Sequence, residues 1–187
     1  GNDGSKKGAK DVDIYESKMQ PDGTWGEAVL LKINDENAWD ACPALSADEK
    51  TLYFASNREG GNGNVDIYTA TRNESGEWDN VVNLGSPINT RGNDMFPHET
   101  KAGVFYFSSD GHPSLGALDI FKVVKNADKL RIENCGTGLN SSYDDFAVCF
   151  KDSVSGYFTS NRPDGKGDDD IYEFEREVCK LKYVLTG

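Results

Sequence analysis

Three aspartates recur at positions that could carry carboxylate chemistry. Asp40, Asp94 and Asp145 are almost equally spaced along the chain, and each follows an asparagine of a parallel series, Asn34, Asn89 and Asn140. Carboxylates gathered around one opening could bind a cation or a basic peptide, or serve as the acid and base of a glycosidase. The alternative is that each aspartate caps its own turn by accepting hydrogen bonds from backbone N–H groups. Recurrence favours the cap, because catalytic residues are usually singular.

Two further sets of residues could bind metal or form covalent links. The loop 163–170 is rich in aspartate, and Asp164, Asp168 and Asp169 are a weak candidate for Ca²⁺ binding, although the loop lacks the EF-hand spacing and also fits a solvated turn. The cysteines are Cys42, Cys135, Cys149 and Cys179. None forms a C-x-x-C motif, which argues against zinc, while Cys135 and Cys149 could pair in an oxidising compartment. We expect no cofactor.

The aspartates belong to an internal repeat with a period near 50 residues. The phrases DVDIY, NVDIY, ALDIF and DDDIY place an aspartate at matching positions, namely Asp13, Asp66, Asp119 and Asp170. The apolar segments TLYFAS, VFYFSS and SGYFTS keep the same period and align Phe54, Phe107 and Phe158. This many matched positions indicate a structural unit that is repeated along the chain.

Each repeat reads as four short strands. In one unit the segments 43–46, 51–56, 65–72 and 78–84 are rich in aromatic and β-branched residues and are bounded by turn formers, and no segment shows helical periodicity. Repeated units of four antiparallel strands predict an all-β chain built as a β-propeller. A sandwich would not need matching units.

The repeat divides the chain into a half blade and three blades. The half blade is 11–32, and the blades are 43–85, 96–136 and 146–185. Since the smallest rings have about four blades, we expect these three and a half blades to be part of a larger ring. Otherwise the ring is open, and its strand edges need a partner.

The loop between the second and third strands carries the most distinctive residues. The phrases SNREGGNGNVDIY and SNRPDGKGDDDIY share an arginine and an aspartate, Arg58 with Asp66 and Arg162 with Asp170. We expect each aspartate to accept hydrogen bonds from the glycine-rich turn or to pair with that arginine. Asp119 has no such arginine, because Asp110 and Gly111 replace the Asn-Arg of the other copies. These five residues are therefore expected to be a structural signature.

The repeat resembles a known family. The run PALSADEKTLYFASNREGGNGNVDIY is similar to the WD-like propeller repeat of TolB and its relatives, and WDNVVNLGSPIN is similar to the continuation found in OmpA-associated envelope proteins of Bacteroidetes. The resemblance covers almost the whole chain and is strongest to the propeller of PorE-type proteins of the type IX secretion system. It implies periplasmic, outer-membrane-associated location, envelope or secretion-system partners, and contact with peptidoglycan only through other domains.

Composition narrows the function classes. The chain of 187 residues has a formal net charge of −12, which disfavours nucleic acid and anionic lipid as partners. No segment approaches the roughly 20 apolar residues of a membrane helix. We expect a non-enzymatic interaction scaffold; a glycan- or ligand-binding propeller and a carboxylate glycosidase are the alternatives. The candidate contact residues are Trp39, the only tryptophan outside the repeat pattern, then Asp40, Asp94 and Asp145, and His98, which follows Pro97 in an expected innermost strand.

Overall fold

The structure is a computed structural model, which describes residues 12–126, 129–163 and 165–176. These residues form strands and loops and contain no helix, so no membrane-spanning helix occurs among them. The strands are β1 (Tyr15–Glu16), β2 (Val29–Leu30), β3 (Asp40–Leu45), β4 (Thr51–Ser56), β5 (Asp66–Arg72), β6 (Trp78–Asn83), β7 (Asp94–Glu99), β8 (Phe105–Ser109), β9 (Asp119–Asn126), β10 (Lys129–Asn134), β11 (Asp145–Phe150), β12 (Ser155–Ser160) and β13 (Asp170–Glu175).

The strands form four antiparallel sheets that follow one another in sequence. The β1–β2 pair comes first, then a first sheet of β3–β6, a second sheet of β7–β10 and a third sheet of β11–β13. Strands adjacent in sequence are adjacent in each sheet, which confirms the predicted four-stranded antiparallel unit. A fourth strand expected before residue 185 lies outside the described residues.

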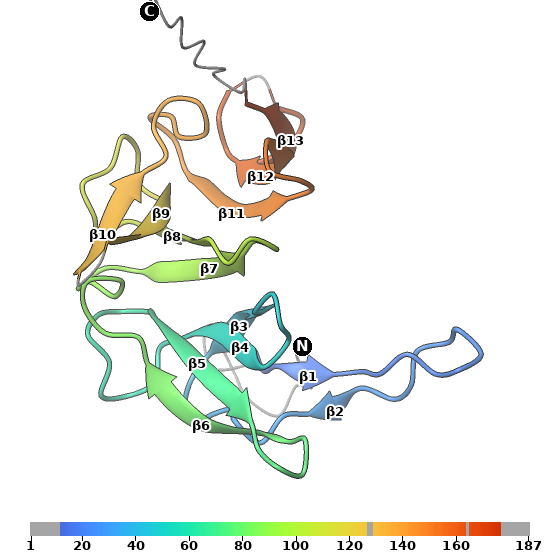
Figure 1. Ribbon diagram of the computed structural model, residues 1–187. Helices are drawn as coiled ribbons and strands as arrows, with labels where there is room; N and C mark the ends of the chain where they lie inside the picture. The colour runs from blue at the N-terminus through green and yellow to red at the C-terminus, as the bar shows by residue number, and fades with distance from the viewer. Residues whose placement is uncertain (1–11, 127–128, 164, 177–187) are drawn as a thin grey trace, which may run out of the picture.

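The sheets succeed one another along an arc, with β3, β7 and β11 at neighbouring positions (Figure 1). Backbone hydrogen bonds link each sheet to the one before it. The N–H groups of Asp40, Asp94 and Asp145 donate to the carbonyl oxygens of Val12, Val65 and Leu118, at 3.1, 2.8 and 2.7 Å. The first residues of β3, β7 and β11 therefore link each sheet to the preceding part of the chain.

Three hydrophobic clusters fill the spaces between sheets. Tyr68 packs with Ile14 in the cluster toward the β1–β2 pair, whereas Ile67 packs with Phe107 in the cluster toward the second sheet. Ile67 and Tyr68 therefore point to opposite faces of the sheet, as alternation along a strand requires. A third cluster, with Ile120 and Phe158, joins the second and third sheets.

The first strand of each of the three larger sheets contains a bulge that the sequence did not indicate. The register shifts between Ala41 and Ala44 in β3, and at the matching places in β7 and β11. At each bulge a non-glycine residue has a left-handed backbone: Cys42, Phe96 and Ala147 have φ of 53, 53 and 54°. The bulge lets pairing continue toward the aspartate, so β3 begins at Asp40 and not at Pro43 as predicted.

Ala147→Gly should stabilise the protein by about 1 kcal/mol, because glycine removes the steric cost of the left-handed conformation. Ala41→Gly is the matched control in an ordinary strand position, where the added flexibility should cost about 0.5–1 kcal/mol. Urea unfolding of both variants measures the two effects. A loss of stability in both would show that the bulge stores no strain at Ala147.

Candidate functional site

The three predicted carboxylates occupy equivalent buried positions. Asp40, Asp94 and Asp145 are each 0% exposed. One oxygen of each closes the turn that leads into its strand, by accepting a hydrogen bond from a backbone N–H at 2.5–2.7 Å; the donors are Asp35, Thr90 and Ser141. Their geometry is that of turn caps, and a ligand on the surface does not reach them.

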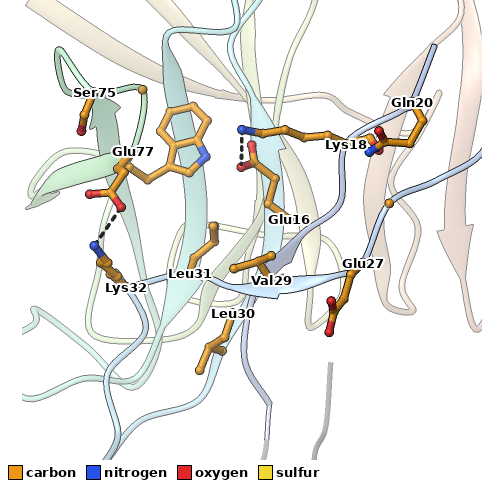
Figure 2. A pocket seen from close by; sticks show the side chains of 13 residues that line it. Glu16, Lys18, Gln20, Glu27, Val29, Leu30, Leu31, Lys32, Ser75 and Glu77 are labelled. Atoms are coloured by element: carbon orange, nitrogen blue, oxygen red, sulfur yellow. Dashed lines mark hydrogen bonds and ion pairs between the residues drawn. The ribbon is translucent and has the colours of Figure 1, made fainter.

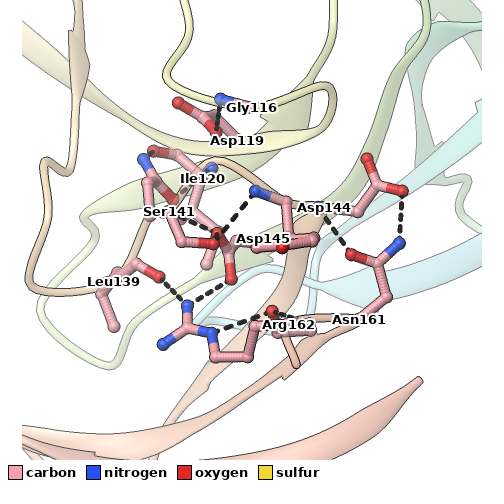
Figure 3. Close-up of polar contacts among 12 residues, drawn as sticks. Gly116, Asp119, Ile120, Leu139, Ser141, Asp144, Asp145, Asn161 and Arg162 are labelled. Atoms are coloured by element: carbon pink, nitrogen blue, oxygen red, sulfur yellow. Dashed lines mark hydrogen bonds and ion pairs between the residues drawn. The ribbon is translucent and has the colours of Figure 1, made fainter. Parts of the chain in front are cut away.

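The second oxygen of two of these carboxylates binds an arginine from the end of the neighbouring strand. Arg58 Nη2 lies 2.7 Å from Asp40 Oδ1 and also donates to the Ile33 carbonyl oxygen at 3.0 Å. Arg162 repeats the arrangement with Asp145 and with the Leu139 carbonyl oxygen (Figure 3). The sequence-based pairings Arg58–Asp66 and Arg162–Asp170 are therefore wrong.

The strand register explains why the arginines choose these partners. Asp40 is paired across β3 and β4 with Ser56, whose hydroxyl accepts a hydrogen bond from Arg58 Nε at 2.9 Å. The guanidinium then lies 5.0 Å from the ring centres of both Phe54 and Tyr68. Stacking and the carboxylate together hold the arginine in one orientation.

The signature aspartates after the loop have a separate role. Asp66 accepts hydrogen bonds from the backbone N–H groups of Asn62 and Gly63, and from Asn83 Nδ2 at 2.8 Å. Asp119 and Asp170 cap their own loops in the same way. The expectation that these aspartates accept hydrogen bonds from the turn is confirmed.

The recurrent asparagines clamp the third strand of each repeat. The side chain of Asn89 accepts a hydrogen bond from Ile67 N at 2.9 Å and donates to Ile67 O at 2.9 Å. Asn34 and Asn140 make the same two hydrogen bonds with the backbone of Ile14 and Ile120. The sequence aligned these asparagines correctly, but it did not reveal this role.

The second sheet departs from the other two at the arginine position. His112 occupies the space of the arginine: its Nε2 donates to the Ile88 carbonyl oxygen at 3.0 Å, and its ring contacts Phe107 and Phe121. Within the described residues no hydrogen bond reaches Asp94 Oδ1. Burial raises the pKa of Asp94, and its neighbours Ser109, Thr90 and His112 offset only part of that rise. Sequence reasoning missed this role of His112, because the histidine comes one residue after the aligned position.

Trp39 breaks the repeat in a different way. The matching residues Asn93 and Asp144 use both backbone and side chain to bind Asp110 and Asn161. Trp39 keeps only the backbone contacts, from its N–H to Asn57 Oδ1 at 2.7 Å and from Asn57 N to its carbonyl oxygen at 3.3 Å. Its indole is partly exposed. Trp39 is thus a partly buried residue whose side chain does not make the hydrogen bond found in the other two repeats.

His98 lies on β7 at the contact between the second and third sheets. Its Nε2 accepts a hydrogen bond from Phe150 N at 3.3 Å, and the two rings stack with centroids 6.0 Å apart. Burial lowers the pKa of His98, and Glu99 opposes this shift. His98 is a neutral packing residue in this arrangement.

The metal and cysteine candidates do not come together. Asp164 lies outside the described residues, and Asp168 and Asp169 are in an exposed turn; no group of three or more potential ligand side chains occurs in the described part of the chain. Cys135 and Cys149 are free thiols, not the disulfide that was considered. Burial raises the pKa of Cys42 and of Cys135 to about 11, which makes both thiols unreactive at neutral pH.

A cavity of about 380 Å³ lies between the β1–β2 pair and the loop that precedes β6 (Figure 2). Val29 and Leu31 contribute apolar lining. Besides Glu27, four charged side chains line the cavity, and these are paired: Lys32 contacts Glu77 at 2.8 Å, and Lys18 contacts Glu16 at 3.9 Å. The mutual neutralisation leaves no free charge among these four to select a ligand.

No family model matches the chain, and a search of curated proteins found no significant match.

Proposed function

We propose that the chain is part of a β-propeller that acts as a non-enzymatic protein-interaction scaffold at the bacterial cell envelope. The sequential four-stranded sheets, with innermost strands side by side, support the propeller. The similarity of its repeat to OmpA-associated envelope proteins supports a periplasmic, outer-membrane-associated location. Its partner would then be a subunit of an outer-membrane machine, with type IX secretion as the first choice, tethered to peptidoglycan through other domains.

The scaffold proposal rests on a contrast between the recurrent polar residues, which have structural roles, and Trp39, which has no matching role. The recurrent aspartates, arginines and asparagines are taken up by turns and clamps within or between sheets. Trp39 is the departure that leaves a large aromatic side chain partly exposed at the start of an innermost strand. Tryptophan is strongly enriched among residues that dominate protein interfaces.

Trp39→Asn tests the proposal, because asparagine is the residue that the second repeat has at this position. The variant should fold with unchanged stability, since the new side-chain oxygen can accept a hydrogen bond from Asn57 Nδ2, as Asp144 accepts one from Asn161 Nδ2. Its recovery of secretion-machine subunits from crosslinked envelope extract should fall at least tenfold, as expected for loss of a central aromatic contact.

Trp25→Asn is the matched control. Trp25 is 67% exposed but follows the repeat pattern, and it lies between β1 and β2 and not beside Asp40, so its loss should leave recovery unchanged. If Trp39→Asn retains full recovery, the partner binds elsewhere. If wild-type protein recovers no envelope protein, the scaffold proposal fails, and the glycan- or ligand-binding alternative replaces it.

A further inference from the structure

A second cavity, of about 400 Å³, lies between the second and third sheets, at the end of the strands opposite Trp39. The loop after β7 and the loop after β11 form its rim, and side chains from β8 and β9 and the residue after β13 complete it. Its size suits a small organic molecule. This cavity is independent of the proposed scaffold role.

The charges in this cavity are opposite in sign to those of the chain as a whole. Four cationic side chains line it, Lys101, Lys122, Lys151 and Arg176, against one acidic residue, Asp152. Asp152 is engaged by the backbone N–H groups of Val154 and Ser155 and by the Ser155 hydroxyl. In a chain with 32 acidic and 20 basic residues, such a local excess of cations is unexpected.

Three of these cations have no carboxylate partner within the described part of the chain. Lys151 contacts Glu173 at 3.0 Å, whereas Lys101, Lys122 and Arg176 form no ion pair there. The Arg176 guanidinium is held by stacking, 5.1 Å from the centre of the Phe150 ring and 5.5 Å from that of Phe174. Stacking leaves the edge of a guanidinium available to a carboxylate.

The floor of the cavity is aromatic. Tyr106 and Phe150 pack with ring centroids 4.6 Å apart, and both line the cavity together with Val104. A ligand that places an apolar group on this floor brings any attached anion close to the cationic rim.

The junction between the first and second sheets has an internal carboxylate that the junction between the second and third sheets lacks. There the position of Phe150 is taken by Glu99, whose carboxylate accepts hydrogen bonds from the Tyr53 hydroxyl at 2.8 Å and from Ala47 N at 3.3 Å. Tyr106 is the repeat equivalent of Tyr53, and Lys122 stands where the first sheet has Thr69. The second junction thus replaces an internal carboxylate with an aromatic ring and adds a cation.

We propose that this cavity binds a small organic carboxylate carried on an apolar, preferably aromatic, group. The carboxylate interacts with the Tyr106 hydroxyl, Lys122 and Arg176, which line the cavity beside the Phe150 ring. The apolar group covers Phe150 and Val104. Selectivity for an anion comes from the unpaired cations, and selectivity for an apolar body comes from the floor.

N-acetyl-L-phenylalanine is a suitable probe, and its neutral amide, N-acetyl-L-phenylalaninamide, is the matched control ligand. Titration of the isotope-labelled protein, followed by amide chemical shifts, should show saturable changes at Tyr106, Lys122 and Phe150 for the acid. The amide should bind at least tenfold more weakly. Equal binding of acid and amide, or no binding of the acid at concentrations up to about 10 mM, would overturn the proposal.

Two variants taken from the first junction locate the site. Lys122→Thr introduces the residue of the first sheet and should weaken binding of the acid at least tenfold. Lys50→Thr, in the loop after β3, is the control and should leave the affinity for the acid unchanged. Phe150→Glu supplies an internal carboxylate and should abolish binding. Phe150→Glu also removes a packed ring. If this variant does not fold, Lys122→Thr alone decides the question. Unchanged affinity in Lys122→Thr would contradict the assignment.

Discussion

Arg58→Met should destabilise the protein by about 3–5 kcal/mol, the range found when one partner of a buried ion pair is removed. The side chain of Arg58 is 13% exposed and that of Asp40 is 0% exposed, so methionine leaves a carboxylate that water does not reach. The Ile33 carbonyl oxygen also loses its donor. Since domains are stable by only about 5–15 kcal/mol, the change should be plain in chemical unfolding.

Two controls separate the buried charge from general loss of packing. The double variant Arg58→Met, Asp40→Asn removes the charge and should regain part of the lost stability. Lys32→Met breaks the exposed contact with Glu77 and should have almost no effect, because surface pairs contribute little. If Arg58→Met costs no more than Lys32→Met, the buried pair of Arg58 and Asp40 does not stabilise the fold.

Replacing the aspartate by asparagine should have opposite effects on stability in the first and second sheets. Asp94→Asn should stabilise the protein at neutral pH by about 1–3 kcal/mol, because it removes the charge of a buried oxygen that lacks a donor. The amide oxygen can still accept the hydrogen bond from Thr90 N. Asp40→Asn is the matched comparison, and it should destabilise by removing the partner of Arg58.

The stabilisation by Asp94→Asn should depend on pH. The folded-state pKa of Asp94 is raised, so the folded protein takes up this proton at a higher pH than the unfolded chain. The cost of the charge is fully present above the folded-state pKa, and it declines as the pH falls toward 3.8, the ordinary value. Unfolding free energies of wild type and variant should therefore converge on acidification. A difference that is constant with pH would mean that the Asp94 charge is not the cause.

The repeat made much of the fold predictable. Strand positions, the opposite faces of Ile67 and Tyr68 and the turn-capping aspartates follow from alternation and turn chemistry, which are local properties. The partner of Arg58 was not predictable in this way, because it depends on which residue of β3 faces the end of β4. The left-handed residue in each bulge had no glycine to mark it.

The candidate sites depended on departures from the repeat. Trp39 could be found from the sequence, because it stands where the other copies have a polar residue that binds across the loop. The second cavity could not, since Lys122, Phe150 and Arg176 are far apart in sequence and meet only through the packing of the second and third sheets. The difference between Glu99 and Phe150 at the same repeat position is visible in the sequence, but its meaning depends on how the sheets pack.

Site-specific photocrosslinking tests the scaffold proposal most directly. A photoreactive phenylalanine analogue in place of Trp39, in the full-length protein in cells, should form a crosslink to one subunit of an envelope machine. The same analogue in place of Val82, which is 48% exposed on β6, is the control and should form none. A single crosslinked subunit from position 39 alone is the predicted result. Equal crosslinking from both positions, or none from position 39, would contradict the proposal that Trp39 marks a partner-binding surface.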